Sequence, residues 1–545
     1  MKSLSLMILT LLLSLNVYAG LESIPVQDAG RIKPFDTFAR ESLALAWGKE
    51  KYKGKPATQV IMSWIMVPEE WDKNEFIQVR HSGLREALQL DKVRIYYSPT
   101  ELITNDKLAL MVQELRSKQE ERVKLDPFFQ ALQRLENQIS VYQGIRMGLA
   151  MNMVPAENDE NNDKWLYLQK FEEPYKSGFQ EILTAFATLA GAENSGDKGK
   201  IKEAKAEMDA KADAFVELIK KDFGDDYAPF SQIAAELHYN KAHPFMYSWI
   251  FYLLATILFG VVVFGGSGRY EKAAWICMLI GFLLHTYGFG LRVYITGRAP
   301  VTNMYETVVW VAWGAIICSV ILERFYKQKV LLPAAGVVAT LSLILCDLSS
   351  HVLDGSLHPL EPVLRDNFWL LVHVLTITLS YATFFVAFIL GDIILFMAWK
   401  DEKKFKAQIA SSAQAIYRCL QVGVVLLAAG TILGGVWADY SWGRFWGWDP
   451  KETWAFIALM GYLAILHGRI GGMLKNFGLA ACSVLGFSLV IMAWYGVNFV
   501  LGAGLHTYGF GAGGVEYVSA FVAVHLLYVA FVTTVRQSRL KAEQS

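Results

Sequence analysis

The chain has 545 residues, 54% of them hydrophobic, and a formal net charge of zero. This length exceeds one average soluble domain, so we expect at least two structural parts. The hydrophobic residues are unevenly spread, because residues 20–245 are charged and mixed whereas 246–535 form a series of long apolar runs. The balanced charge gives no indication of nucleic-acid binding, and we expect no nucleic-acid partner.

The N-terminal segment, MKSLSLMILTLLLSLNVYAG, contains one lysine, a short apolar run and a small-residue ending at Ala19. This pattern is typical of a secretory signal peptide over residues 1–19, cleaved before Gly20. An uncleaved anchor is the alternative, although the apolar run is short for a membrane-spanning helix. Under either interpretation the chain from Gly20 onward is exported.

Residues 20–245 are expected to form a mostly helical exported domain. Stretches such as Leu108–Met147 and Ile201–Phe223 are rich in Ala, Leu, Glu, Lys and Gln, with apolar residues three and four positions apart. The histidines of this part have no ligand spacing, so we expect no catalytic site in it; they are His81, His238 and His243.

The second part predicts an all-α polytopic membrane protein with about nine transmembrane helices. The first helix links the exported domain to an eight-helix core over residues 270–535, and a short tail, 536–545, follows. Each run is long enough to cross about 30 Å of hydrocarbon. The predicted spans are 246–265, 272–294, 304–324, 330–347, 368–398, 415–437, 452–470, 477–499 and 515–535.

The distribution of basic residues predicts the orientation. If residues 20–245 lie outside, the cytoplasmic segments carry fourteen Lys and Arg residues and the exported loops carry five. The positive-inside rule therefore agrees with the signal peptide, and the C-terminus is expected in the cytoplasm.

The five cysteines all lie in or beside apolar runs, and the chain contains neither a CxxC pair nor a CxxCH motif. We therefore expect no disulfide framework and no thiolate metal site. The absence of CxxCH also indicates that the chain is not itself a c-type cytochrome.

The exported loop 437–454 contains five tryptophans within eighteen residues. An aromatic belt at the membrane surface is one interpretation. Alternatively, the indole rings suit a large, flat, apolar ligand with a polar edge. Part of the loop is architectural, because Asp449–Glu452 has the N-cap acid, first-turn proline and N3 glutamate that begin a helix. Asn303–Glu306 repeats this capping pattern for the third span.

The topology separates the histidines by membrane side. His373 lies near the outer end of the fifth span and His506 in the last exported loop, so both are placed to ligate a metal at the centre of such a ligand. His467 ends the seventh span near the cytoplasmic face. His285 begins the first of two HTYGFG copies, inside the second span, and is expected to pack against polar neighbours. Asp392 is interpreted as structural, paired with nearby lysines.

The segment WGRFWGWDPKETW, Trp442–Trp454, resembles the defining motif of the WWD-domain family of haem-handling cytochrome c assembly proteins. Three further segments resemble that family over residues 270–535. They are Trp369–His373 with Ser380-Tyr381, Asn498-Phe499 with Gly504–Gly509, and Gly297–Thr307.

The closest type is the CcsA/ResC synthase of the two-component System II pathway, often fused to CcsB/ResB. Ile24–Glu41 looks like the exported region in front of the core in fused members, which implies a CcsB-like domain over 20–245. Fused members carry another intramembrane histidine in an early CcsB span, and this sequence has no span there. The partner of His467 is then expected from a CcsB-like membrane subunit or from His285.

The resemblance implies the roles of individual residues. His373 and His506 would be axial ligands of the iron of haem b, and His467 a ligand of haem in transit. Arg298, Arg365 and Arg444 are candidate partners of the haem propionates. The remaining haem-binding residues implied are Trp442, Trp446, Trp448, Asp449 and Trp454.

The resemblance also implies a function: haem transport across a bacterial inner membrane, followed by covalent attachment to the CxxCH thiols of apocytochrome c by a holocytochrome c-type synthase. The exported domain and the tryptophan loop would face the periplasm. The thiols must be reduced, so a thioredoxin-like reductant is an expected partner. The alternatives are a haem exporter or chaperone that forms no thioether bond, and a respiratory b-type cytochrome.

Overall fold

The computed structural model describes residues 20–121, 125–156, 165–263, 267–327, 329–348, 353–359, 367–501, 504–506 and 514–544. The chain divides into two compact units, unit 1 over Met1–Ala242 and unit 2 over His243–Ser545.

Unit 1 is mostly helical, with short strands that the sequence analysis did not anticipate. Its larger sheet is antiparallel with the order β2-β1-β7-β8, and Gln27 of β1 pairs with Asn152 of β7. The strands are β1 Pro25–Asp28, β2 Arg31–Pro34, β3 Lys51–Tyr52, β4 Lys55–Pro56, β5 Ile77–Gln78, β6 Tyr96–Tyr97, β7 Asn152–Pro155 and β8 Trp165–Tyr167. The α-helices are α2 Phe35–Trp47, α3 Ala57–Met66, α4 Pro68–Asp72, α5 Ser82–Ala87, α6 Pro99–Ile103, α7 Asp106–Glu120, α8 Pro127–Arg146, α9 Tyr175–Ser195, α10 Lys198–Phe223 and α11 Phe230–Ala242. The residues described in this unit also form three 3₁₀ turns: η1 Leu21–Ser23, η2 Leu168–Lys170 and η3 Asp225–Tyr227.

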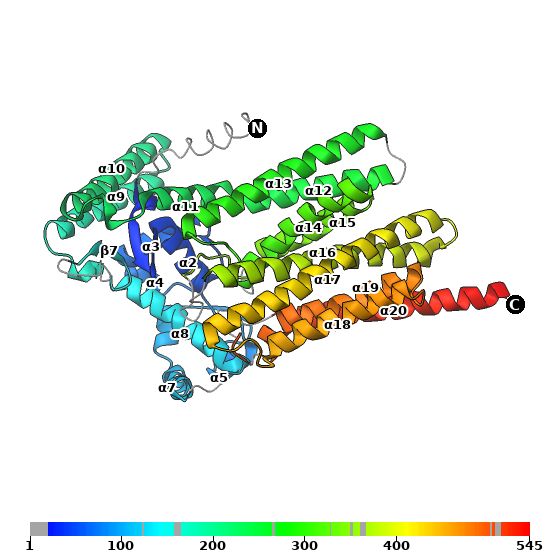
Figure 1. The fold of residues 1–545 in the computed structure, drawn as a ribbon. Coiled ribbons are helices and arrows are strands. Elements are labelled where there is room, and N and C mark those ends of the chain that lie inside the picture. The colour runs from blue at the N-terminus through cyan, green and yellow to red at the C-terminus, as the bar shows by residue number, and fades with distance from the viewer. Residues whose placement is uncertain are drawn as a thin grey trace. The chain divides into compact units, whose positions relative to one another are not determined.

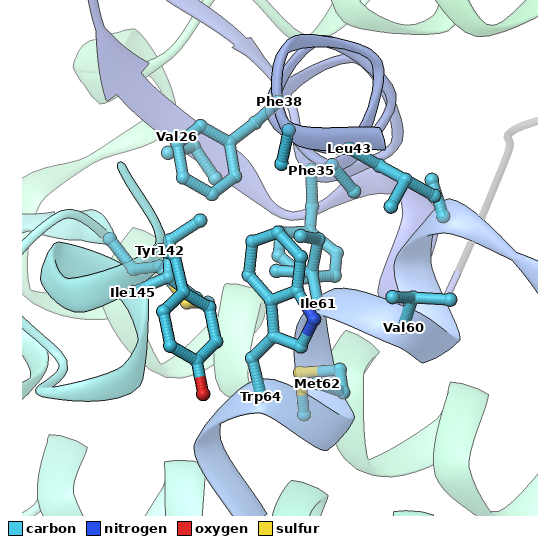
Figure 2. Packing of buried hydrophobic residues seen from close by; sticks show 14 of the residues in the cluster. Val26, Phe35, Phe38, Leu43, Val60, Ile61, Met62, Trp64, Tyr142 and Ile145 are labelled. Carbon is cyan, nitrogen blue, oxygen red and sulfur yellow. The ribbon is translucent and has the colours of Figure 1, made fainter. Parts of the chain in front are cut away.

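The core of unit 1 is centred on Trp64 of α3, which is fully buried. Figure 2 shows Tyr142 of α8 facing this indole, and the two rings meet edge to face with centroids 5.2 Å apart. Such an aromatic pair contributes about 0.5–1.5 kcal/mol beyond the burial of its area. Unit 1 therefore has a hydrophobic core of its own.

Unit 2 is a bundle of long apolar helices (Figure 1). Among the described residues, nine helices are long and apolar enough to cross a membrane, and each overlaps one of the nine predicted spans, although the first begins earlier, at Phe230. The prediction of an all-α polytopic membrane protein is confirmed. The helices of unit 2 are α12 Pro244–Val263, α13 Gly268–Thr296, α14 Met304–Tyr326, α15 Leu331–Leu348, α16 Asn367–Asp401, α17 Lys406–Trp442, α18 Pro450–Ile470, α19 Asn476–Ile491 and α20 Val515–Gln544, with the π-helix η4 Met492–Leu501 continuing α19.

Glycines allow α16 and α17 to pack closely, and this is the most extensive helix pair of unit 2. A Cβ added at Gly430 would lie 2.7 Å from Cβ of Ile377, and one added at Gly434 would lie 2.8 Å from Nδ1 of His373. Gly430 and Gly434 form a GxxxG pattern, which lets backbones approach in membranes. The N-terminal part of α16 and the C-terminal part of α17 are thereby held together around His373.

Two helix starts follow the predicted capping chemistry. Asp449 caps α18 and forms a capping box with Glu452, with Pro450 in the first turn. Asn303 caps α14, and its side chain accepts a hydrogen bond from the amide of Glu306. Both predictions are confirmed.

The expected pairing of Asp392 with lysines is wrong. Oδ2 of Asp392 on α16 lies 3.4 Å from Nε2 of His525 on α20. The lysines lie further along the chain, at and after the end of α16. The imidazole of His525, on the neighbouring helix α20, lies next to the carboxylate of Asp392 instead. An ionisable group inside the membrane needs such a partner.

Candidate functional site

A cavity of about 150 Å³ lies in unit 2 among α14, α16, α17, α18 and η4. We call it the histidine cavity, because His373 and His506 both line it. Its walls are largely apolar, with a few polar groups. Its lining also includes Gly434, Trp437, Trp446, Lys451, Glu452, Trp494 and Asn498.

His373 is held by the neighbouring helix. Its Nδ1 lies 2.7 Å from the carbonyl oxygen of Gly430. Because a carbonyl only accepts hydrogen bonds, Nδ1 carries the proton, and the lone pair of the ring is on Nε2. Metal-ligating histidines typically have one ring nitrogen fixed in this way. His373 therefore has the tautomer of a ligand.

His506 is held in the same way by a carboxylate. Its Nδ1 lies 2.8 Å from Oδ1 of Asp449, and the amide of Leu505 donates to Oδ2 of Asp449 at 2.6 Å. Burial alone would raise the pKa of Asp449, but the hydrogen bonds from His506 and from the backbone outweigh burial and lower the pKa to about 2. The N-cap of α18 thus also orients His506.

The backbone at Gly504 makes this contact possible. Its φ of +97° favours glycine, and an added Cβ would collide with Oδ2 of Asp449. Gly504 therefore lets the segment carrying His506 approach the start of α18.

Trp437 brings the two histidines to one place. The indole of Trp437 is buried and nearly parallel to the ring of His373, with centroids 6.5 Å apart. The ring of His506 lies 6.0 Å from the same indole, and Trp442 packs on the edge of His506 at 4.9 Å. Side chains from α16, α17 and the segment after η4 thus form one cluster.

The other predicted tryptophans are less close to the histidines. Trp446 lines the cavity and meets Trp448 edge to face at 5.8 Å. Trp448 is 67% exposed. Trp454 is half-buried on α18 and does not line the cavity. Trp442 therefore packs against the histidine cluster and Trp446 lines its cavity, whereas neither Trp448 nor Trp454 is among the lining residues.

His467 lies elsewhere. It is exposed on α18, and its Nδ1 contacts the carbonyl oxygen of Leu463 at 2.7 Å. At 1.5 Å per residue, it is about 25 Å along the helix from Pro450. His467 is therefore not part of the histidine cavity.

His285 is fully buried on α13. Its Nδ1 lies 3.3 Å from the hydroxyl of Tyr252, and its Nε2 lies 3.1 Å from the carbonyl oxygen of Val309. Both ring nitrogens have hydrogen-bonding partners, so this arrangement is that of a packed, satisfied histidine.

Two of the three candidate arginines are engaged by carboxylates. Arg298 lies 3.4 Å from Oε2 of Glu306 and donates to the carbonyl oxygen of His358 at 2.7 Å. Arg444 donates to Oε1 of Glu452 at 2.9 Å. Arg365, and Tyr508 and Gly509 of the family-like segment, lie outside the described residues.

Lys451, rather than one of these arginines, places a basic side chain at the wall of the histidine cavity. Its Nζ donates to Oδ1 of Asn498 at 3.2 Å. The sequence analysis placed Lys451 at the start of a helix and among the five basic residues of the exported loops, and assigned it no role in binding. Its position two residues after Asp449, in the first turn below the tryptophan loop, was the available signal. Asn498 and Trp494 come from the π-helix η4, and such irregular helices are frequent at functional sites.

The donor set favours a metal held by a macrocycle. Within the described part of the chain, no group of three or more His, Cys, Asp or Glu side chains could hold a metal ion. Two imidazoles beside a cluster of indoles instead suit a flat ligand that brings its own equatorial nitrogens. The residues fit haem.

The family model described as Cytochrome C assembly protein matches residues 301–506, a range that includes both histidines of the cavity. The cytochrome c biogenesis protein CcsA of Prochlorococcus marinus strain MIT 9301 is 32% identical over 296 residues, covering 48% of this chain and 92% of that protein. CcsA of Guillardia theta is 32% identical over 265 residues, covering 44% of this chain and 85% of that protein.

Protein NrfI of Wolinella succinogenes is 28% identical over 495 residues, which cover 88% of this chain. That match is longer than unit 2, so it extends into unit 1. The chain spans about half the length of NrfI, 53%. Since this chain covers nearly all of a CcsA that is 32% identical to it, it belongs to the CcsA family of cytochrome c assembly proteins.

Proposed function

We propose that this protein carries haem across a bacterial inner membrane and attaches it covalently to apocytochrome c. The observation that carries this proposal is the pairing of His373 and His506 on one cavity, each with Nδ1 engaged and each against Trp437. Membership of the CcsA family supports a role in cytochrome c biogenesis.

Haem b is the substrate held at this site. Nε2 of His373 and Nε2 of His506 are its axial ligands, and Trp442 and Trp446 cover its apolar face. Lys451 takes the role first assigned to the arginines, and binds a propionate. A drug-sized ligand usually fills about 300–1,000 Å³. The cavity of about 150 Å³ therefore encloses part of the macrocycle and leaves the rest accessible to the apocytochrome.

The covalent step uses nucleophiles of the substrate protein. Each CxxCH thiol adds across a haem vinyl group, so that one C–S bond forms and the thiol hydrogen goes to the neighbouring vinyl carbon. The histidine of CxxCH replaces one of the two axial imidazoles. No electrons are exchanged, but the thiols must be reduced, which implies a thioredoxin-like reductant in the periplasm. The cysteines of this chain are free.

His467 is the ligand of haem in transit. The hydrogen bonds at both nitrogens of His285 favour a CcsB-like membrane subunit as the source of the second transit ligand. Residues 1–19 are the signal peptide, and residues 20–245 are the exported, CcsB-like domain. Helix 246–265 links that domain to the 270–535 core, whose loop 437–454 faces the periplasm.

Co-expression with an apocytochrome c and a CcsB-like subunit tests the proposal. The expected product is cytochrome that keeps its haem after denaturation, and His373→Ala or His506→Ala should reduce its yield more than tenfold. Haem-loaded protein with unmodified apocytochrome would overturn the lyase activity and favour the exporter or chaperone alternative.

A further inference from the structure

Gly20 lies against two carboxylates of α10. Its amide nitrogen donates to Oδ1 of Asp213 at 2.6 Å, and the next amide, of Leu21, donates to Oδ1 of Asp209 at 3.4 Å. Gly20 is buried and has a φ of +93°, and an added Cβ would collide with Asp209. Only glycine fits at this position.

The surroundings of Gly20 carry an excess of negative charge. Burial raises the pKa of Asp209, and nearby Glu22 and Asp213 raise it further, whereas the Leu21 amide and Lys205 lower it. Lys241 of α11 lies 2.6 Å from Glu22. The charged groups around the site are Glu22 of η1, Asp36 and Arg40 of α2, Lys205, Asp209 and Asp213 of α10, and Lys241 of α11. The neutral amide of Gly20 donates a hydrogen bond to Asp213, but it carries no positive charge to balance that of the carboxylate.

The sequence independently marks the bond before Gly20. Residues 1–19 are typical of a signal peptide, and Ala19 is the small residue at its end. Hydrolysis of the Ala19–Gly20 bond consumes one water molecule and yields a carboxylate on Ala19 and an ammonium on Gly20. The new positive charge would arise beside Asp209 and Asp213.

We propose that cleavage before Gly20 creates a partly buried N-terminal ion pair, in which the Gly20 ammonium binds Asp213 and Asp209. An ammonium offers three donors and a full charge where the amide offers one donor. Cleavage thereby fastens η1 to α10. Ile24 and Val26, both fully buried, follow directly, so the pair fixes the entry of the chain into the core of unit 1.

The test uses the full chain purified from membranes. Mass spectrometry should find Gly20 as the first residue. The Gly20 amine should react with an acylating reagent at pH 7.5 at least tenfold more slowly than it does in Asp213→Asn. The matched control is Glu203→Gln, which removes an exposed carboxylate of the same helix and should leave the rate unchanged.

Raising the pH provides a second readout in the unmodified chain. An unperturbed α-amino group has a pKa of about 7.7–8.0. The carboxylates stabilise the charged form, so protection from acylation should persist well above pH 8 and disappear near pH 10. A chain that begins elsewhere, or a Gly20 amine that reacts at pH 7.5 as fast as an unprotected amine, would overturn the proposal. None of these readouts depends on haem.

Discussion

His506 and Asp449 form a hydrogen-bonded pair, with Nδ1 of the imidazole 2.8 Å from Oδ1 of the carboxylate. The same carboxylate caps α18 and accepts a hydrogen bond from the amide of Leu505. One buried side chain therefore fixes the start of a helix, the course of the segment after η4 and the orientation of an imidazole.

Asp449→Asn should separate these roles. Asparagine is as good an N-cap as aspartate, so α18 should still begin at Pro450. The loss of the carboxylate should make His506 a weaker ligand and lower haem affinity about 10–100-fold, the usual effect of removing such a partner. Haem titration of the purified protein measures this. Asp126→Asn, the same change at the cap of α8, should leave affinity unchanged. Equal affinities in both variants would contradict the orienting role.

The low pKa of Asp449 predicts a specific pH dependence. Its folded pKa of about 2 is below the unfolded value, about 3.9, so its contribution to folding stability is complete above the unfolded value and is lost as the pH falls toward 2. The difference in the free energy of unfolding between the parent and Asp449→Asn should stay constant from pH 8 to pH 5 and decrease below about pH 4. A difference that changes between pH 8 and pH 5 would show that another group controls it.

Lys451→Met should change selectivity for carboxylated haem. A charge-assisted hydrogen bond contributes about 1.5–3 kcal/mol, or about 10–100-fold in affinity. Binding of haem should weaken by that factor, whereas binding of its dimethyl ester, which has no propionate charge, should be the same in variant and parent. Lys406→Met, at the start of α17, is the control. Equal losses for both ligands would assign Lys451 a packing role.

Gly434→Ala should displace His373. The added Cβ would lie 2.8 Å from Nδ1, so the ring must leave the carbonyl oxygen of Gly430. The variant should lose haem, and added imidazole should restore an axial ligand and the absorption bands. Gly290→Ala on α13, where an added Cβ meets nothing within 4 Å, is the matched control. Normal haem retention in Gly434→Ala would exclude His373 as a ligand held in this orientation.

The Asp392–His525 pair should be a measurable link between α16 and α20. Removing one partner of a buried ion pair costs about 3–5 kcal/mol, and less where the side chains are partly exposed, as here. Asp392→Asn and His525→Gln should each lower the unfolding temperature, and the double variant should lower it less than their sum. The exchanged pair, Asp392→His with His525→Asp, should recover part of the loss. Strict additivity would show that the two side chains do not interact.

The membrane helices were predictable from the sequence because each one consists of a continuous apolar run long enough to cross a membrane. The sequence also predicted the starts of α14 and α18, since capping depends on residues three positions apart. The strands that the structure describes in unit 1 have only two to four residues, too few for a recognisable alternation.

The details of the site depend on packing between distant segments. His373 contacts the carbonyl oxygen of Gly430, and His506 contacts the carboxylate of Asp449. In each pair the two residues are 57 positions apart in the sequence. The sequence made Arg298 and Arg444 candidates for binding the propionates. In the structure, Arg298 is paired with Glu306 and Arg444 with Glu452. Lys451 was not predicted to line the cavity, because its place between the N-cap Asp449 and Glu452 already accounted for it as part of a helix start.

We propose that His373 and His506 hold one haem between them. The absorption spectrum of the detergent-purified protein, compared with the spectra of His373→Ala and His506→Ala, tests this directly. We predict reduced bis-histidine haem in the parent, loss or alteration of its bands in both variants, and recovery with added imidazole. A parent purified without haem in the presence of a CcsB-like subunit, or variants with unchanged spectra, would contradict it.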